Sequence, residues 1–394
     1  MLNVGITGQA GFIGTHLFNY LDLKKEQVRL VSFRDEFFED TSKLEEFVRN
    51  CDVIVHLAAM NRNNDPEILF KTNILLVEKL ISAIEETNSR PHIIFASSLQ
   101  EERDNPYGRS KTEGRRLLEK LSERKAIPLT SLIIPNVFGP FGNPFYNSVI
   151  ATFCHQLTHG EEPHIDLDGS LKLIYVGELV ELIYQKIKDK SHKTKVKDGK
   201  TKDKSHKTKV EKGAIETCLI QLTSEKRVSE ILSLLQKFKK LYFENGILPD
   251  LSNSFELNLF NTFLCYIDHQ KFFPFPLKLN TDERGSFVET MKLNSGGQIS
   301  FSTTKSDITR GNHFHTRKAE RFVVLKGIAR IELRRIGTDK VMIFEMDGNK
   351  PSFVDMPIWY THNITNTGEG DLYTLFWTNE PYNPDDTDTF FEKV

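Results

Sequence analysis

Cysteine is scarce in this sequence of 394 residues, with only four copies, and these lie far apart without any Cys-x-x-Cys pair. Neither a disulfide framework nor a cysteine zinc site is therefore indicated. The sequence also lacks a run of eighteen apolar residues, and no charged leader precedes its first strand-like segment at residues 2–7. We expect a soluble protein of the reducing cytoplasm, with no membrane insertion and no export.

Lysine is concentrated in one stretch, although the formal net charge of the whole sequence is only −2. Residues 186–212 hold twelve lysines and four acidic residues, a local charge of +8 that leaves −10 elsewhere. The stretch contains no arginine and no aromatic residue for base stacking, so we expect no nucleic-acid binding. The sequence of 188–196 recurs at 202–210, and so short a polar repeat cannot bury a core. We predict a disordered insertion at 186–213.

The hydrophobic pattern changes along the chain, and its length favours two or three domains. Apolar segments alternate with helical patterns in the first part, with strands expected at residues 3–7, 28–33, 53–57, 93–97 and 129–134. This alternation predicts an α/β fold, a Rossmann-type doubly wound parallel sheet. From Pro274 onward, short alternating strands with glycine turns predict an all-β barrel or sandwich. We place the boundary near residue 270, giving domains at 1–270 and 271–394.

A glycine motif at residues 7–14 follows the first strand and opens the first helix. In that context glycines permit a tight turn and the close approach of a pyrophosphate, whose charge lies at the helix N-terminus. Arg34 follows the second strand, where an enzyme that uses NAD has an acidic residue for the ribose hydroxyls. An arginine suits a 2′-phosphate, so we predict NADPH, although Asp35 is adjacent.

Tyr107 and Lys111 are one turn apart at the start of a predicted helix. An ammonium group beside a phenol is expected to lower the pKa of the tyrosine, which would make Tyr107 a proton donor and acceptor near neutral pH. Ser98, at the end of the fourth strand, is placed to hold a substrate carbonyl. Such a pair is common by chance in helices, but the glycine motif upstream favours a catalytic site.

Together with residues 52–59, Ser97-Ser98 and the motif at 135–140, these residues resemble the extended short-chain dehydrogenases/reductases. The resemblance implies substrate contacts from Ser98, Asn136 and Asn147. It implies cofactor contacts from Gly8, Gly11, Phe12, Ile13, Gly14, Arg34, Leu57, Ala58, Ala59, Tyr107, Lys111 and Pro135. The sequence departs from the family in the short spacing between Ser98 and Tyr107 and at Ile133 or Ile134, where an arginine is expected. These departures concern substrate placement more than cofactor binding.

A second potential site follows in the all-β part. His313 and His315 alternate on one strand, so both side chains lie on one face, and Glu320 can return on the next strand. With His362 they offer nitrogen and oxygen ligands for a divalent first-row metal, with zinc the expected ion. The spacing of Glu320 from Gly327 and the motif at 357–366 resemble the cupin family, although Trp359 replaces a common glycine.

A reductase followed by a cupin resembles the bifunctional enzymes of capsular polysaccharide biosynthesis. This resemblance implies a cytoplasmic homodimer and a UDP-2-acetamido-2,6-dideoxyhexos-4-ulose as substrate. The cupin would epimerise the sugar, at carbon 3, and the reductase would reduce the 4-ketone with NADPH to UDP-2-acetamido-2,6-dideoxy-L-talose. The carbon beside the ketone is acidic only while the ketone exists, so epimerisation must come first. His315 is a candidate base, although it is also a candidate ligand.

Two other interpretations stay open. In the first, the protein is an NADPH-dependent 4-keto sugar reductase whose cupin binds metal structurally and builds a dimer. In the second, it is an NADP-binding regulator without catalysis, and such proteins typically lack the tyrosine and lysine that this sequence retains at Tyr107 and Lys111.

Overall fold

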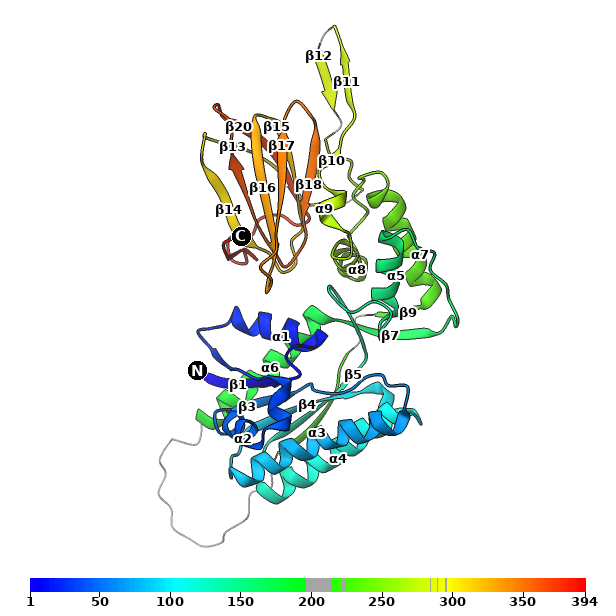
Figure 1. The fold of residues 1–394 in the computed structure, drawn as a ribbon, viewed down its shortest axis with the longest axis vertical. Helices are drawn as coiled ribbons and strands as arrows, with labels where there is room; N and C mark the ends of the chain where they lie inside the picture. Colours follow the sequence, from blue (N-terminus) through cyan, green and yellow to red (C-terminus); the bar gives the residue numbers. More distant parts are fainter. Residues whose placement is uncertain (196–213, 222–223, 284, 289, 295) are drawn as a thin grey trace. The chain divides into compact units, whose positions relative to one another are not determined.

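The computed structural model describes residues 1–195, 214–221, 224–283, 285–288, 290–294 and 296–394. Contacts divide the chain into two compact units (Figure 1). Unit 1 comprises Met1–Phe138, Phe145–Ser148 and Ser170–Lys226, and unit 2 comprises Gly139–Pro144, Val149–Gly169 and Arg227–Val394. Each unit is described below by itself.

Unit 1 is built on a six-stranded parallel sheet of order β2-β1-β3-β4-β5-β8. Its strands are β1 (Leu2–Thr7), β2 (Val28–Val31), β3 (Val53–His56), β4 (His92–Ser98), β5 (Leu129–Ile134) and β8 (Ile215–Leu219). The strands read as apolar runs because helices cover both faces of the sheet. The strand order turns back between β1 and β3, and ligands of such sheets bind at this point, beyond the carboxyl ends of the strands.

The helices of unit 1 lie in two layers (Figure 1). One face carries α1 (Phe12–Asp22) and α6 (Val176–Lys195), and the other carries α2 (Thr41–Arg49), α3 (Pro66–Glu86) and α4 (Pro106–Lys125). Buried side chains of α2, α3 and α4 pack on β3, β4 and β5 and form a core on this face of the sheet. Two short helices, η1 (Asp35–Glu39) and η2 (Leu99–Glu102), and a small sheet of β6 (Asn136–Phe138), β7 (Ser170–Tyr175) and β9 (Ser224–Arg227) complete it.

Unit 2 contains a β-barrel of two five-stranded sheets. The first sheet has the order β10-β18-β15-β20-β13, from β10 (Phe275–Pro276), β13 (Gln298–Thr304), β15 (Glu320–Lys326), β18 (Ser352–Met356) and β20 (Leu372–Thr378). The second has the order β17-β16-β19-β14-β21, from β14 (Thr309–Phe314), β16 (Ile328–Arg335), β17 (Val341–Asp347), β19 (Tyr360–Asn366) and β21 (Phe390–Phe391). A separate hairpin, β11 (Leu279–Asp282) and β12 (Gly285–Val288), extends from the barrel (Figure 1).

Helices also belong to unit 2, namely α5 (Val149–Thr158), α7 (Val228–Phe238), η4 (Lys239–Phe243), α8 (Ser254–Leu264) and α9 (His269–Phe272). Phe272 and Phe273 pack into the same apolar core as the barrel residues Val323 and Phe353. By these contacts, residues 227–272 group with the barrel in unit 2. The domain boundary near residue 270 stays a prediction.

The predicted combination of a doubly wound parallel sheet and an all-β barrel is confirmed. Helix α6 continues to Lys195 and so includes the start of the lysine-rich stretch. The rest of the predicted insertion, residues 196–213, lies outside the described residues. Among the described residues, no helix combines the length and the apolar character needed to cross a membrane.

Candidate functional site

The glycine motif forms a tight turn between β1 and α1. Gly8 has a φ of +69°, and its carbonyl oxygen accepts a hydrogen bond from the N–H of Gly11 at 3.1 Å. A Cβ added at Gly14 would lie 2.2 Å from that same oxygen, so the turn and the first helical turn pack without space for a side chain. Gly11 caps α1 without a side-chain hydrogen bond. This glycine-lined helix N-terminus fits a pyrophosphate.

Most of the other predicted cofactor residues lie along the same edge of the sheet. Phe12 and Ile13 are the first residues of α1, and Arg34 is exposed between β2 and η1. Leu57 follows β3, where its N–H donates to the carbonyl of Thr7 at 3.2 Å. A Cβ at Gly8 would lie 2.8 Å from Ala58, so the segment of Leu57, Ala58 and Ala59 lies directly against the glycine turn. The turn after β1 and the segment after β3 thus meet at the predicted ligand edge.

Helix α4 holds the tyrosine and the lysine. Asn105 caps it by accepting from the N–H of Gly108 at 2.8 Å, and Pro106 occupies the first turn. Lys111 is buried, and its Nζ donates to the carbonyl of Ala96 at 2.9 Å and lies 5.6 Å from the centre of the Tyr107 ring. The predicted pair is therefore brought together on one face of α4.

The pKa of Tyr107 is raised, whereas the sequence predicted that Lys111 would lower it. Burial, followed by the charge of Tyr146, raises the pKa of Tyr107 above its ordinary value. Burial lowers the pKa of Lys111 to about 8, although Glu101 opposes this shift. Desolvation of the phenolate thus outweighs the stabilisation by lysine that the sequence suggested. Tyr107 holds its proton at neutral pH in this structure.

The predicted substrate residues come from three segments of unit 1. Ser98 ends β4, where its Oγ accepts from the N–H of Gln100 at 3.1 Å. The start of α4 packs tightly on this turn, because a Cβ at Gly108 would lie 2.0 Å from the Gln100 carbonyl. Pro135 and Asn136 follow β5, and the Asn136 amide donates to the carbonyl of Lys172 at 3.2 Å; Asn147 is exposed on the segment 145–148.

Sequence reasoning missed two residues that support this site. Asn73 is buried on α3, accepts from the N–H of Met60 at 2.6 Å and donates to the Oγ of Ser110 at 3.0 Å. It joins the loop after β3 to α4. Arg62 donates to the carbonyl of Tyr146 at 3.2 Å and so holds the segment 145–148. For Asn73, the signal in the sequence is a single asparagine within the apolar pattern of α3.

The four predicted metal ligands converge in the barrel. His313, His315, Glu320 and His362 each offer a ligand atom, and these atoms lie within 4.8 Å of one another. Nε2 of His315 and Nε2 of His362 lie 3.4 and 3.0 Å from Oε2 of Glu320. Apart from these contacts with one another, the three buried atoms have no hydrogen-bond partner within the described residues. Three imidazoles and a carboxylate gathered around one point form a donor set that fits a divalent ion such as zinc.

The second nitrogen of two imidazoles is already engaged. Nδ1 of His315 contacts the carbonyl of Asp388 at 2.5 Å, and Nδ1 of His362 contacts the carbonyl of Tyr360 at 3.2 Å. A carbonyl only accepts, so each Nδ1 carries a proton, and each Nε2 is the nitrogen that faces the cluster and would bind an ion. Burial, followed by the neighbouring His362, lowers the pKa of His313 to about 4. The imidazole of His313 is therefore neutral at pH 7, as a metal ligand requires.

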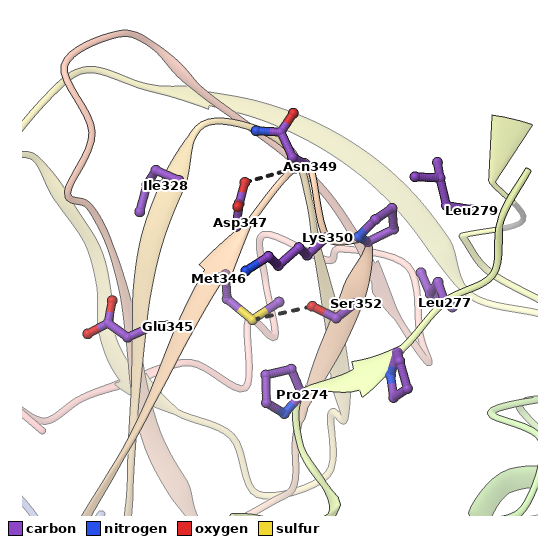
Figure 2. A pocket seen from close by; sticks show the side chains of 12 residues that line it. Pro274, Leu277, Leu279, Ile328, Glu345, Met346, Asp347, Asn349, Lys350 and Ser352 are labelled. Carbon is purple, nitrogen blue, oxygen red and sulfur yellow. Dashed lines mark hydrogen bonds between the residues drawn. The ribbon is translucent and has the colours of Figure 1, made fainter. Parts of the chain in front are cut away.

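A separate groove of about 570 Å³ lies on the outside of the barrel (Figure 2). Apolar residues of the segment 274–279 form one side, and residues 345–352 form the other. None of the predicted catalytic, cofactor or metal residues lines it. Its lining is Pro274, Pro276, Leu277, Leu279, Ile328, Glu345, Met346, Asp347, Asn349, Lys350, Pro351 and Ser352.

Known proteins match both parts of the chain. Residues 4–197 match the NAD dependent epimerase/dehydratase family, and residues 280–390 match the polysaccharide biosynthesis C-terminal domain. The chain is 30% identical over 392 residues to the UDP-2-acetamido-2,6-beta-L-arabino-hexul-4-ose reductase of Pseudomonas aeruginosa, covering 99% of this chain and 98% of that protein.

Solved structures agree with these matches. The capsular polysaccharide assembling protein CapF from Staphylococcus aureus is 32% identical with a TM-score of 0.57, covering 100% of both chains. A UDP-glucose 4-epimerase from Thermotoga maritima, 20% identical with a TM-score of 0.51, covers 67% of this chain and 98% of its own and shares the fold alone. The chain therefore belongs to the family of capsular polysaccharide biosynthesis enzymes in which a short-chain dehydrogenase/reductase domain precedes a cupin domain.

Proposed function

We propose that the protein is a bifunctional enzyme acting on a UDP-linked 4-keto-6-deoxy amino sugar. The observation that supports this most is the presence of two separate reactive clusters, Tyr107 with Lys111 and the His/Glu group of the barrel, in one chain. The relative from Pseudomonas aeruginosa is named a reductase of a UDP-linked hexul-4-ose. A homodimer in the cytoplasm stays a prediction.

The reductase site would convert the ketone into an alcohol. The glycine turn would hold the pyrophosphate of NADPH and Arg34 would hold its 2′-phosphate, and the bound cofactor would supply the hydride for carbon 4. Tyr107 donates its proton to the ketone oxygen, and Ser98 orients that oxygen by a hydrogen bond. Lys111 holds the ribose and stabilises the tyrosinate that remains, which then regains a proton from solvent. The raised pKa of Tyr107 keeps the proton on the phenol before reduction, as a donor requires.

The cupin site would act first and invert carbon 3. A base removes the proton of carbon 3 while the ketone at carbon 4 delocalises the charge as an enolate, and a proton returns to the opposite face. A divalent ion, when bound to His313, His315, Glu320 and His362, supplies positive charge beside this site. Nε2 of His315 faces Glu320 in the cluster, so we assign His315 as a ligand and not as the base. Reduction then gives UDP-2-acetamido-2,6-dideoxy-L-talose.

The main alternative is a reductase with a purely structural cupin. Incubation with NADPH and the UDP-linked 4-keto sugar in deuterated water distinguishes the two, because inversion of carbon 3 takes up solvent deuterium. We expect NMR of the product to show an alcohol with deuterium at carbon 3, above the exchange measured without enzyme. An alcohol without deuterium would favour the structural cupin, and no alcohol would contradict the assigned substrate.

Two variants separate the sites in the same experiment. Tyr107→Phe is expected to place deuterium in the ketone without forming alcohol, whereas His362→Ala is expected to abolish the deuterium. If His362→Ala still incorporates deuterium at the wild-type rate, the barrel cluster takes no part in the epimerisation.

A further inference from the structure

The loop that joins two metal-ligand candidates is held by one buried carboxylate. Residues 316–319 connect His315 to Glu320, and the N–H groups of Thr316, Arg317 and Lys318 donate to Asp388 at 3.0 to 3.2 Å. The hydroxyl of Thr316 adds a fourth donor at 2.6 Å. The side chain of Asp388 is 1% exposed, so these hydrogen bonds replace the water that would otherwise solvate its carboxylate.

The backbone of Asp388 contacts a ligand candidate directly. Its carbonyl accepts from Nδ1 of His315 at 2.5 Å, which fixes the tautomer that leaves Nε2 facing the cluster. Asp388 has a φ of +44°, a conformation that aspartate and asparagine adopt more readily than other residues with a side chain. One residue therefore orients His315 through its carbonyl and shapes the loop to Glu320 through its carboxylate.

Neighbouring residues fasten the same segment to the barrel on both sides. Arg317 donates to the carboxylate of Asp386 at 2.8 Å, and Nζ of Lys318 donates to the carbonyl of Thr387 at 2.6 Å. After Asp388, β21 pairs with β14, so that Phe391 lies opposite His313. The segment 386–391 thus contacts the strand β14, which carries His313, and the loop from His315 to Glu320.

We propose that Asp388 is a positioning residue of the metal centre, which sets the geometry of His315 through its carbonyl and that of the loop to Glu320 through its carboxylate. The inference rests on the proposed metal site, and it adds Asp388 as a residue that changes the metal affinity without being a ligand. Carboxylates and carbonyls that orient metal-bound imidazoles typically change metal affinity when they are altered. If the imidazole of His315 rotates, its Nε2 no longer points at the ion, so the coordination geometry should change together with the affinity.

The experiment measures Zn²⁺ affinity of the full chain by competition with a chromophoric chelator, and the visible absorption of the Co²⁺-loaded protein. Asp388→Asn keeps the size and tolerates the positive φ but removes the charge. We expect about 10- to 100-fold weaker Zn²⁺ binding and an altered Co²⁺ spectrum. Asp386→Asn is the matched control, since Asp386 is 64% exposed, contacts Arg317 and does not touch His315. It should keep the wild-type affinity and spectrum.

Each outcome decides a different point. If Asp388→Asn binds Zn²⁺ like the wild type and gives the same Co²⁺ spectrum, the positioning role is wrong while the metal site stands. If the wild type itself takes up neither ion, the proposed metal site fails and the inference fails with it. Should Asp388→Asn not fold, Thr316→Val removes only the 2.6 Å hydroxyl bond to Asp388, and unchanged affinity and spectrum in that variant would overturn the inference.

Discussion

Nζ of Lys111 lies 5.6 Å from the centre of the Tyr107 ring and is held there by its hydrogen bond to the carbonyl of Ala96. Both groups are buried, and burial favours the neutral form of each. It therefore raises the pKa of the phenol and lowers the pKa of the amine to about 8. At neutral pH the phenol therefore holds a proton and the amine is charged. This protonation state suits reduction of a ketone, in which the tyrosine gives up its proton as the oxygen becomes negative.

Replacement of the phenol tests this assignment. Tyr107→Phe keeps the ring and its packing but removes the proton donor, so we expect kcat of ketone reduction to fall by about 10²- to 10⁴-fold. NADPH affinity, measured by fluorescence titration, should stay close to that of the wild type. Tyr20→Phe in the same unit is the control and should retain full activity. Unchanged reduction by Tyr107→Phe would refute the mechanism.

The lysine predicts a pH dependence. The lowered pKa means that Lys111 in the free protein loses its charge as the pH rises through about 8, and only the charged form stabilises the tyrosinate. We expect kcat/KM for reduction, which reports the free enzyme, to decline above that pH. Lys111→Arg should reduce the plateau activity, because the planar guanidinium does not place its donors where the ammonium does. The decline near pH 8 should disappear, because arginine stays charged. A decline that persists in Lys111→Arg would assign it to another group.

Much of the fold, and the residues that gather at both candidate sites, could be predicted from local sequence. The turn at Gly8 needs a residue without a side chain between a strand and a helix, and Tyr107 and Lys111 share a helix face by spacing alone. His313, His315 and Glu320 lie within eight residues of each other, with His313 on β14, His315 just after it, and Glu320 on β15, the next strand along the chain. In these cases the spacing along the chain already fixes which side chains meet, because strand and helix periods are known.

The supporting residues could not be predicted in this way. Asp388 reaches the loop after His315 across more than seventy residues, and Asn73 meets Ser110 from a different helix. Neither residue has a motif of its own, and only tertiary packing brings it to its partner. The pKa of Tyr107 was misjudged for a similar reason, since the pattern revealed the neighbouring lysine but not the burial that outweighs it.

The close packing of the glycine turn gives a third prediction. In Gly14→Ala the new Cβ would lie 2.2 Å from the carbonyl of Gly8 and 2.8 Å from Gln9, so the turn must shift. We expect NADPH binding, followed by fluorescence titration, to weaken by at least about tenfold, because the backbone no longer approaches the pyrophosphate as closely. Gly169→Ala is the control, since no atom lies within 4 Å of a Cβ there. Equal NADPH affinity in both variants would contradict the placement of the pyrophosphate.

A buried ion pair in unit 2 gives the last prediction. Nε of Arg321 donates to Asp355 at 2.7 Å, with both side chains at most 4% exposed, and Tyr242 donates to the same carboxylate at 2.5 Å. Asp355→Ala leaves the guanidinium buried without its counter-charge, which we expect to cost about 3–5 kcal/mol in the free energy of unfolding. Glu345→Ala breaks the exposed pair with Arg330 and should cost less than about 1 kcal/mol.

Urea unfolding followed by tryptophan fluorescence measures this effect in the right unit, because both tryptophans, Trp359 and Trp377, are buried in unit 2. The double variant Arg321→Met with Asp355→Leu separates the two possible origins of the loss. If the cost of Asp355→Ala comes from the uncompensated charge, removing both charges should recover most of the stability. If the double variant is as unstable as the single one, the hydrogen bonds that Arg321 and Asp355 make to Gly246 and Tyr242 carry the stability instead.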